Sequence, residues 1–99
     1  MTFDLVDEPA QGRYVLHLDG EPVGLADYHL DGDVVVIPHT EIDPGRRGGG
    51  LGAELVGRVL DHVRAQGRRV RPDCWYVARY IAGHPEYAGL VDDPGTETE

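Results

Sequence analysis

The chain has 99 residues, a formal net charge of −9 and one cysteine, which fit a single domain with one core and no internal disulfide. The negative charge argues against a nucleic-acid partner, and apolar runs of at most five residues argue against a membrane span. Residues 1–9 lack the basic and apolar regions of a secretory signal, and a single cysteine suits a reducing compartment, so we expect a cytoplasmic protein. We also expect a monomer or weak dimer.

Alternating apolar and polar residues open the chain and predict antiparallel strands. The alternation is seen at Phe3 and Leu5 and again over residues 14–18. Asp19-Gly20 and Asp31-Gly32 are typical of tight hairpin turns, and they bound a further strand over residues 23–30. This stretch therefore predicts a β-meander.

The fourth predicted strand begins with a continuous apolar run over residues 34–37. Such a run is expected in a central strand that is covered on both faces. We expect the strand to continue past Pro38 to about Ile42, where Pro44 and Gly45 break it.

The period then becomes helical over residues 49–66, and Gly67 is a natural residue to end the helix. A short strand over residues 68–71 and a short helix over residues 74–82 complete the pattern. The apolar stripe of the long helix consists of Leu51, Leu55, Val56, Val59, Leu60 and Val63. The order predicts an α+β domain over residues 1–91, with four antiparallel strands, a helix, a parallel strand and a short C-terminal helix, followed by an acidic flexible tail over residues 92–99.

Positive charge is concentrated in one part of this acidic chain. Eight of the nine arginines lie between Pro44 and Tyr80, together with only three acidic residues. The start of the long helix reads RRGGGLG over residues 46–52. First-turn N–H groups lack helical partners, glycines allow close approach, and arginines add charge-assisted hydrogen bonds. This stretch therefore predicts a phosphate-binding loop.

Two well-known types of phosphate-binding loop are alternatives for this stretch. A Walker loop requires lysine, and the chain contains none. The dinucleotide pattern G-x-G-x-x-A fits Gly48, Gly50 and Ala53, with Asp73 about twenty residues later. A doubly wound sheet needs repeated βαβ units, however, and the sequence predicts only one.

A third pattern, R-x-x-G-x-G, is formed by Arg47, Gly50 and Gly52 after the segment HTEI. With Cys74 and the later segment YIAGHPEY, it resembles the GNAT superfamily of N-acetyltransferases, in its minimal single-domain YjdJ-type branch. The resemblance implies a compact GNAT-like fold, acetyl-CoA or coenzyme A as cofactor, and transfer of the acetyl group to an amine.

The resemblance also implies the residues that bind the cofactor. Glu41 and Ile42 would offer backbone groups to the pantetheine arm and the acetyl carbonyl. Cys74 would lie beside the thioester. The pyrophosphate would be held by Arg46, Arg47, Gly48, Gly49, Gly50, Leu51 and Gly52.

Four side chains are candidates for the chemistry of transfer. His39 and Glu41 are two residues apart on a strand, hence on one face, and either could relay a proton from the amine. By resemblance, Tyr80 would act as an acid near the sulfur. Cys74, at a helix start that favours thiolate, could contact the cofactor sulfur, form a mixed disulfide with coenzyme A or carry the acetyl group. Each residue could instead have only a packing or surface role.

The five histidines show no metal-ligand spacing, so we expect no metal. Larger GNAT enzymes place two helices between their first two strands, whereas this chain has only residues 7–12 there. The acceptor side should therefore be open. Three interpretations remain: an N-acetyltransferase, a non-catalytic acyl-CoA-binding module that acts as a sensor or accessory subunit, and a nicotinamide-binding fragment.

Overall fold

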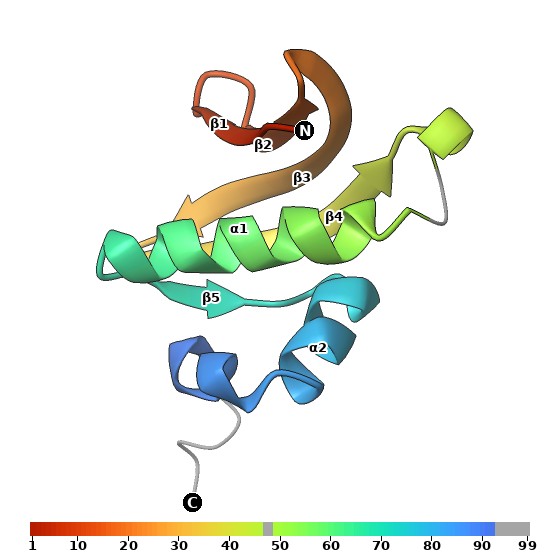
Figure 1. Ribbon diagram of the computed structural model, residues 1–99. Helices are drawn as coiled ribbons and strands as arrows, with labels where there is room; N and C mark the ends of the chain where they lie inside the picture. Colours follow the sequence, from red (N-terminus) through yellow and green to blue (C-terminus); the bar gives the residue numbers. More distant parts are fainter. Residues whose placement is uncertain (47–48, 93–99) are drawn as a thin grey trace, which may run out of the picture.

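Five strands form one mixed sheet in the order β1-β2-β3-β4-β5 (Figure 1). The computed structural model describes residues 1–46 and 49–92. The strands are β1 (Phe3–Glu8), β2 (Arg13–Leu18), β3 (Glu21–Asp31), β4 (Val34–Ile42) and β5 (Arg69–Arg71). The helices are α1 (Leu51–Ala65) and α2 (Trp75–Ala82), with short 3-10 helices η1 (Pro44–Arg46) and η2 (Pro85–Leu90).

The predicted α+β architecture is confirmed. Strands β1 to β4 pair antiparallel in sequence order, and β5 pairs parallel to β4 after the α1 crossover. Asp19 and Gly20 both have positive φ, 51° and 87°, as the tight turn predicted between β2 and β3 requires. The sheet contains one parallel pair, so it is not the doubly wound sheet of the dinucleotide alternative.

The helix α1 packs its apolar stripe against the sheet. All six residues predicted for that stripe are buried. They meet Tyr14, Leu16 and Val35 in one hydrophobic cluster, which α2 joins through Val77 and Ile81. Burial of this stripe fixes the N-terminal end of α1 beside the end of β4, and this placement creates the site described below.

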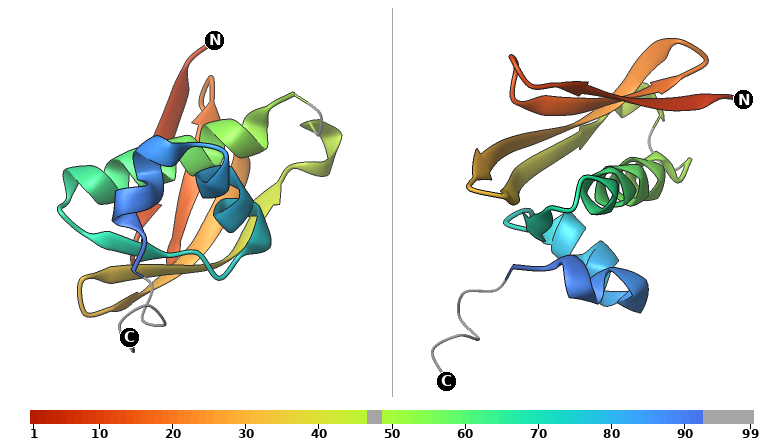
Figure 2. Two further views of the ribbon diagram at one scale, coloured as in Figure 1. Left: turned by 90° about the horizontal axis from the view of Figure 1, so that it is seen from below. Right: turned by 90° about the vertical axis from the view of Figure 1, so that its left-hand side faces the viewer.

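Both α-helices, α1 and α2, lie on the same side of the sheet (Figure 2). The prediction that residues 34–37 are covered on both faces is confirmed, because all four are buried, although no α-helix of the described chain lies on the second face. Val34 and Val36 are buried, but they lie outside the core cluster. They pair in register with Arg69 and Arg71, whose long side chains can cover apolar neighbours on this otherwise open face.

A β-bulge interrupts β4 in its middle. Asp27 pairs with His39 and His29 pairs with Val36, so Ile37 and Pro38 together face one residue of β3. Proline has no N–H to donate, and bulges are among the few positions in a sheet that accept it. A bulge also bends its strand. The second half of β4 therefore runs in a different direction from the first half.

The chain after α2 forms the 3-10 helix η2, which the sequence did not predict. Tyr87 of η2 is buried, and its hydroxyl donates to Asp61 Oδ1 of α1 at 2.8 Å. In the described residues, no helix has the length and apolar character needed to cross a bilayer. The predicted acidic tail lies outside the described residues from position 93 onward.

Candidate functional site

A gap lies beside the second half of β4, because β5 pairs only with Val34–Val36. After Arg71 the chain leaves the sheet, and the Cys74 N–H donates to the Ile37 carbonyl at 2.9 Å. Strand β4 continues to Ile42. Among the described residues, this continuation has no strand on its β5 side.

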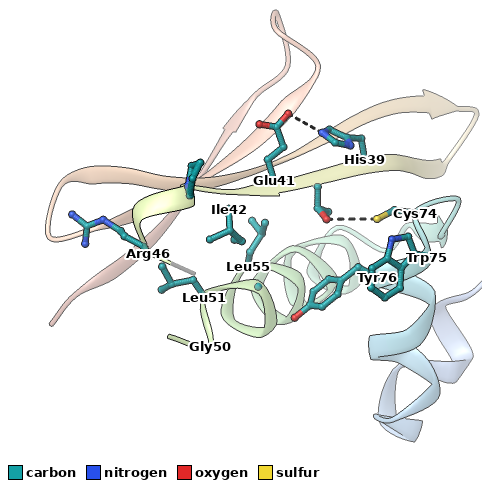
Figure 3. Close-up of a pocket in the computed structure, with 13 residues that line it drawn as sticks. His39, Glu41, Ile42, Arg46, Gly50, Leu51, Leu55, Cys74, Trp75 and Tyr76 are labelled. Atoms are coloured by element: carbon teal, nitrogen blue, oxygen red, sulfur yellow. Dashed lines mark hydrogen bonds and ion pairs between the residues drawn. The ribbon is translucent and has the colours of Figure 1, made fainter. Parts of the chain in front are cut away.

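An open cavity of about 780 Å³ occupies the gap (Figure 3). This volume lies in the usual range of small-molecule sites, roughly 300–1,000 Å³. Its walls are the end of β4, the first turn of α1 and the start of α2. The described lining residues are His39, Thr40, Glu41, Ile42, Pro44, Arg46, Gly50, Leu51, Gly52, Leu55, Cys74, Trp75 and Tyr76.

One end of the cavity is the N-terminus of α1. Gly50 is the N-cap residue with a φ of 76°, and no side chain caps the helix. The Glu54 N–H donates to the Gly50 carbonyl at 3.1 Å, and Leu51 and Gly52 precede it in the first turn. First-turn N–H groups lack partners within their helix, and the helix dipole adds a partial positive charge. This end of the cavity therefore suits an anion.

Arg46 lines the same end, but two carboxylates already engage its guanidinium. Its Nη2 donates to Glu21 Oε1 at 2.9 Å, and its Nε lies 3.7 Å from Asp43 Oδ2. Exposed ion pairs of this kind contribute only about 0–1 kcal/mol, so an anionic ligand can replace them. Arg47 and Gly48, also predicted to bind phosphate, lie outside the described residues. Gly49 is exposed and is not among the lining residues.

The Cys74 thiol lies at the other end of the cavity, at the N-cap position of α2. Its Sγ is 3.5 Å from Thr40 Oγ1, and the side chain is only 8% exposed. Burial raises the pKa of the Cys74 thiol. Hydrogen bonds from the Thr40 hydroxyl and from the backbone of Val77, Tyr76 and Thr40 act in the opposite direction and leave the pKa below its ordinary value. The hydrogen bonds around Cys74 therefore make its thiol more acidic than an ordinary cysteine.

His39 and Glu41 point away from the core and interact directly. His39 Nε2 lies 2.8 Å from Glu41 Oε2, and both side chains are more than half exposed, at 52% and 62%. The predicted common face of these two residues is confirmed. Because both line the cavity, a proton accepted by one can pass to the other and to solvent.

The backbone of β4 offers different residues to the gap from those predicted. The Asp43 N–H donates to the Val23 carbonyl at 2.9 Å. Alternate residues of an antiparallel strand point their backbone groups to the same side, so those of Glu41 are expected to face β3. The groups of Thr40 and Ile42 are then expected to face the gap. This supports the predicted role of Ile42 and transfers that of Glu41 to Thr40.

The structure brings Tyr76, and not Tyr80, into the cavity lining. The Tyr80 ring stacks on His84 with the ring centroids 3.9 Å apart. Its hydroxyl lies against α1 at Gly57, where an added Cβ would be 2.8 Å away. Tyr80, which we expected near the cofactor sulfur, is therefore not among the side chains that line the cavity, because it packs between the two helices.

Tyr76 was missed by the sequence analysis, and it changes the explanation for one glycine. A Cβ at Gly52 would lie 2.6 Å from the Tyr76 hydroxyl and 2.9 Å from its ring carbon Cζ. Contacts shorter than 3.0 Å force one group to move. Gly52 thus makes room for a protein side chain, and close approach of a ligand, the reason predicted from the sequence, is not needed to explain it.

Thr40→Val is expected to raise the pKa of the Cys74 thiol, because the hydroxyl that stabilises the thiolate is lost. Since the thiolate is the nucleophile, alkylation of Cys74 should then require higher pH than in the wild type. Mass spectrometry of the iodoacetamide reaction across pH measures this shift. Thr2→Val, at an exposed position far along the chain, is the matched control. Identical pH profiles for all three proteins would contradict the contribution of Thr40.

Comparison with known proteins places this architecture in a family. The family model described as GCN5-related N-acetyl-transferase matches residues 13–90. The chain therefore belongs to the GCN5-related N-acetyltransferase family. A search of curated protein sequences gives no match.

Solved structures show the same fold at low sequence identity. A GCN5-like protein from Staphylococcus aureus has a TM-score of 0.67 and 15% identity, over 90% of this chain and 87% of that one. The ribosomal-protein-S18-alanine N-acetyltransferase of Escherichia coli has a TM-score of 0.58 and 17% identity, over 72% of this chain and 49% of that one. N-acetylglutamate synthase of Neisseria gonorrhoeae, complexed with coenzyme A and N-acetyl-glutamate, has a TM-score of 0.50 and 24% identity, over 60% of this chain and 15% of that one.

Proposed function

We propose that the protein is an acetyl-coenzyme A-dependent N-acetyltransferase that transfers acetyl groups from the thioester to an amine of a protein, peptide or small molecule. One observation carries the proposal: a single cavity extends from the N-terminus of α1 to the thiol of Cys74. An anion site and a sulfur-binding end are thus joined by a gap beside β4. We place this activity in the cytoplasm, whose reducing conditions keep Cys74 a thiol.

Acetyl-coenzyme A supplies a pyrophosphate, a flexible arm and an activated acetyl thioester, and each part has a counterpart in the cavity. The first-turn N–H groups of α1 and Arg46 would hold the pyrophosphate. Arg47 and Gly48–Gly50 are proposed to contribute to the same loop. The backbone groups of Thr40 and Ile42 would bind the arm and donate a hydrogen bond to the acetyl oxygen as its charge increases.

Transfer requires an unprotonated amine, whereas an alkyl amine such as lysine has a pKa near 10.4. His39 or Glu41 would accept the proton, because the two side chains are hydrogen-bonded to each other at the rim of the cavity. Their exposure allows the proton to continue to solvent. This pair would act as the general base.

The departing sulfur needs a proton donor or another stabilising group. Tyr76 and Cys74 both line the cavity and carry a hydroxyl and a thiol. We give the role of acid to Tyr76, in place of Tyr80, because the Tyr80 ring is occupied by its stack on His84. Cys74, held by Thr40, would contact the sulfur or accept the acetyl group before the amine does.

A second candidate function is a non-catalytic module that binds acyl-coenzyme A as a sensor or accessory subunit. The observation in its favour is the direct connection between β1 and β2. A tight turn joins them, with the Gln11 N–H donating to Glu8 and the Gly12 N–H donating to Pro9. No helix encloses the acceptor side of the described chain at this connection. An open acceptor side excludes water poorly, which favours slow chemistry or binding alone.

The two functions are separated by measuring binding and thioester consumption together. Coenzyme A, but not NAD, should raise the melting temperature, and acetyl-coenzyme A should release free thiol only when a suitable amine is present. Tyr76→Phe should lower turnover about tenfold or more, as the loss of a general acid does. Tyr80→Phe is the matched control and should keep wild-type turnover. Stabilisation without any amine-dependent thiol release across a broad amine panel would favour the binding module, and stabilisation by NAD alone would reject both functions.

A further inference from the structure

Trp75 is the only tryptophan of the chain, and its position is unusual for so large an apolar side chain. It is 70% exposed, although it lines the cavity immediately after Cys74. Most other large apolar side chains of the described chain are buried or half-buried. Figure 3 shows the indole at the Cys74 end of the cavity, away from Gly50 and Arg46.

The indole is held in place despite its exposure. Its ring meets the Tyr76 ring edge to face, with the centroids 5.8 Å apart and the planes at 90°. Tyr76 is in turn fitted against the first turn of α1, because Gly52 leaves room for it. A braced aromatic ring offers a contact surface at a low entropic cost, which distinguishes Trp75 from a freely rotating surface residue.

The electrostatics of this end favour a cation. An indole face attracts positive charge, and tryptophan does so best among aromatic side chains. Glu41 also lines the cavity, but its carboxylate lies beside His39, on the other side of β4 from Cys74 (Figure 3). Arg46 is the one arginine among the described lining residues, and it lies at the α1 end of the cavity, away from Trp75. The net charge of −9 also attracts cationic ligands as they approach.

We propose that Trp75 selects acceptor amines that carry a second positive charge, in the class of small aliphatic diamines. This inference rests on the proposed acetyl transfer. In the reaction, the C–S bond of the thioester breaks and a C–N bond forms to one nitrogen of the diamine. The proton released from that nitrogen passes through His39 and Glu41 to solvent, and the sulfur departs as the thiol after protonation. The second ammonium group remains charged against the indole throughout.

Three acceptors of equal chain length test the selection: 1,5-diaminopentane, pentylamine and 5-aminopentanoate. They share a five-carbon chain whose far carbon carries an ammonium group, is a methyl group or is a carboxylate carbon. We expect kcat/KM for the diamine to exceed that for pentylamine by about five- to thirtyfold, the factor for a partly desolvated cation–π contact, and 5-aminopentanoate to be the poorest. Trp75→Leu should remove most of this preference, and Trp75→Phe should retain part of it. An unchanged preference in Trp75→Leu would overturn the role of Trp75.

Fluorescence supplies a second readout that does not need turnover. Because Trp75 is the only tryptophan, its emission reports on this end of the cavity directly. In protein saturated with coenzyme A, 1,5-diaminopentane should change the emission at several-fold lower concentration than pentylamine. Equal responses to the three compounds overturn the inference, even if all of them are acetylated. A diamine-selective response without thioester consumption supports the selective site and contradicts the proposed catalysis.

Discussion

Gly52→Ala is expected to lower the affinity for coenzyme A about tenfold, because the Tyr76 ring would move into the cavity and binding would have to displace it at a cost near 1.4 kcal/mol. The new Cβ would lie 2.6 Å from the Tyr76 hydroxyl and 3.1 Å from the ring carbon Cε2. The phenol must then move, and the cavity lies beside it. Isothermal titration calorimetry with coenzyme A measures the change.

Two further variants show why Gly52 matters. Gly45→Ala is the matched control in the preceding turn, because its nearest contact would be Asp43 Oδ1 at an ordinary 3.6 Å. It should bind coenzyme A as the wild type does. The double variant Gly52→Ala with Tyr76→Ala should recover most of the affinity relative to Tyr76→Ala alone, since the clash is gone. If the double variant stays tenfold weaker, Gly52 is needed for direct approach of the phosphate, and the steric explanation fails.

Leu60→Ala is expected to lower the free energy of unfolding by about 2–5 kcal/mol. Leu60 has no exposed surface and belongs to the core cluster between α1 and the sheet. For a domain whose total stability is roughly 5–15 kcal/mol, such a loss shifts the urea midpoint strongly. Leu30→Ala is the matched control, because Leu30 is 48% exposed and its truncation should change stability by less than about 0.5 kcal/mol. Equal effects of the two substitutions would contradict the assigned core.

Local patterns were enough to predict most of the fold. The helical stripe from Leu51 to Val63 predicted the buried face of α1, because side chains three and four apart share a helix face. Asp19-Gly20 predicted a hairpin because few residue pairs accept positive φ at both positions. Each of these features depends on residues close together in the chain, where sequence spacing translates directly into geometry.

The site was predicted less completely, because its details depend on contacts between distant segments. Tyr76 and Tyr80 lie one helical turn apart, so the sequence favours neither as the tyrosine of the cavity. The choice depends on where α2 meets α1, and Gly52 and Gly57 provide the space for the two rings. The ion pair of Arg46 with Glu21 is likewise invisible in the sequence, since 25 residues separate the two partners.

The bulge at Ile37 and Pro38 was also not predicted, and it determines which substitutions in β4 leave the core unchanged. Before it, the odd-numbered residue Val35 faces the helices; beyond it, the even-numbered Thr40 and Ile42 do so. Without that single extra residue, His39 and Glu41 would be driven inward against α1. The inserted position thus keeps the exposed side chains of His39 and Glu41 and the packing side chains of the same strand on opposite sides. Substitutions that retune acceptor chemistry at 39 and 41 should therefore leave the hydrophobic interior intact.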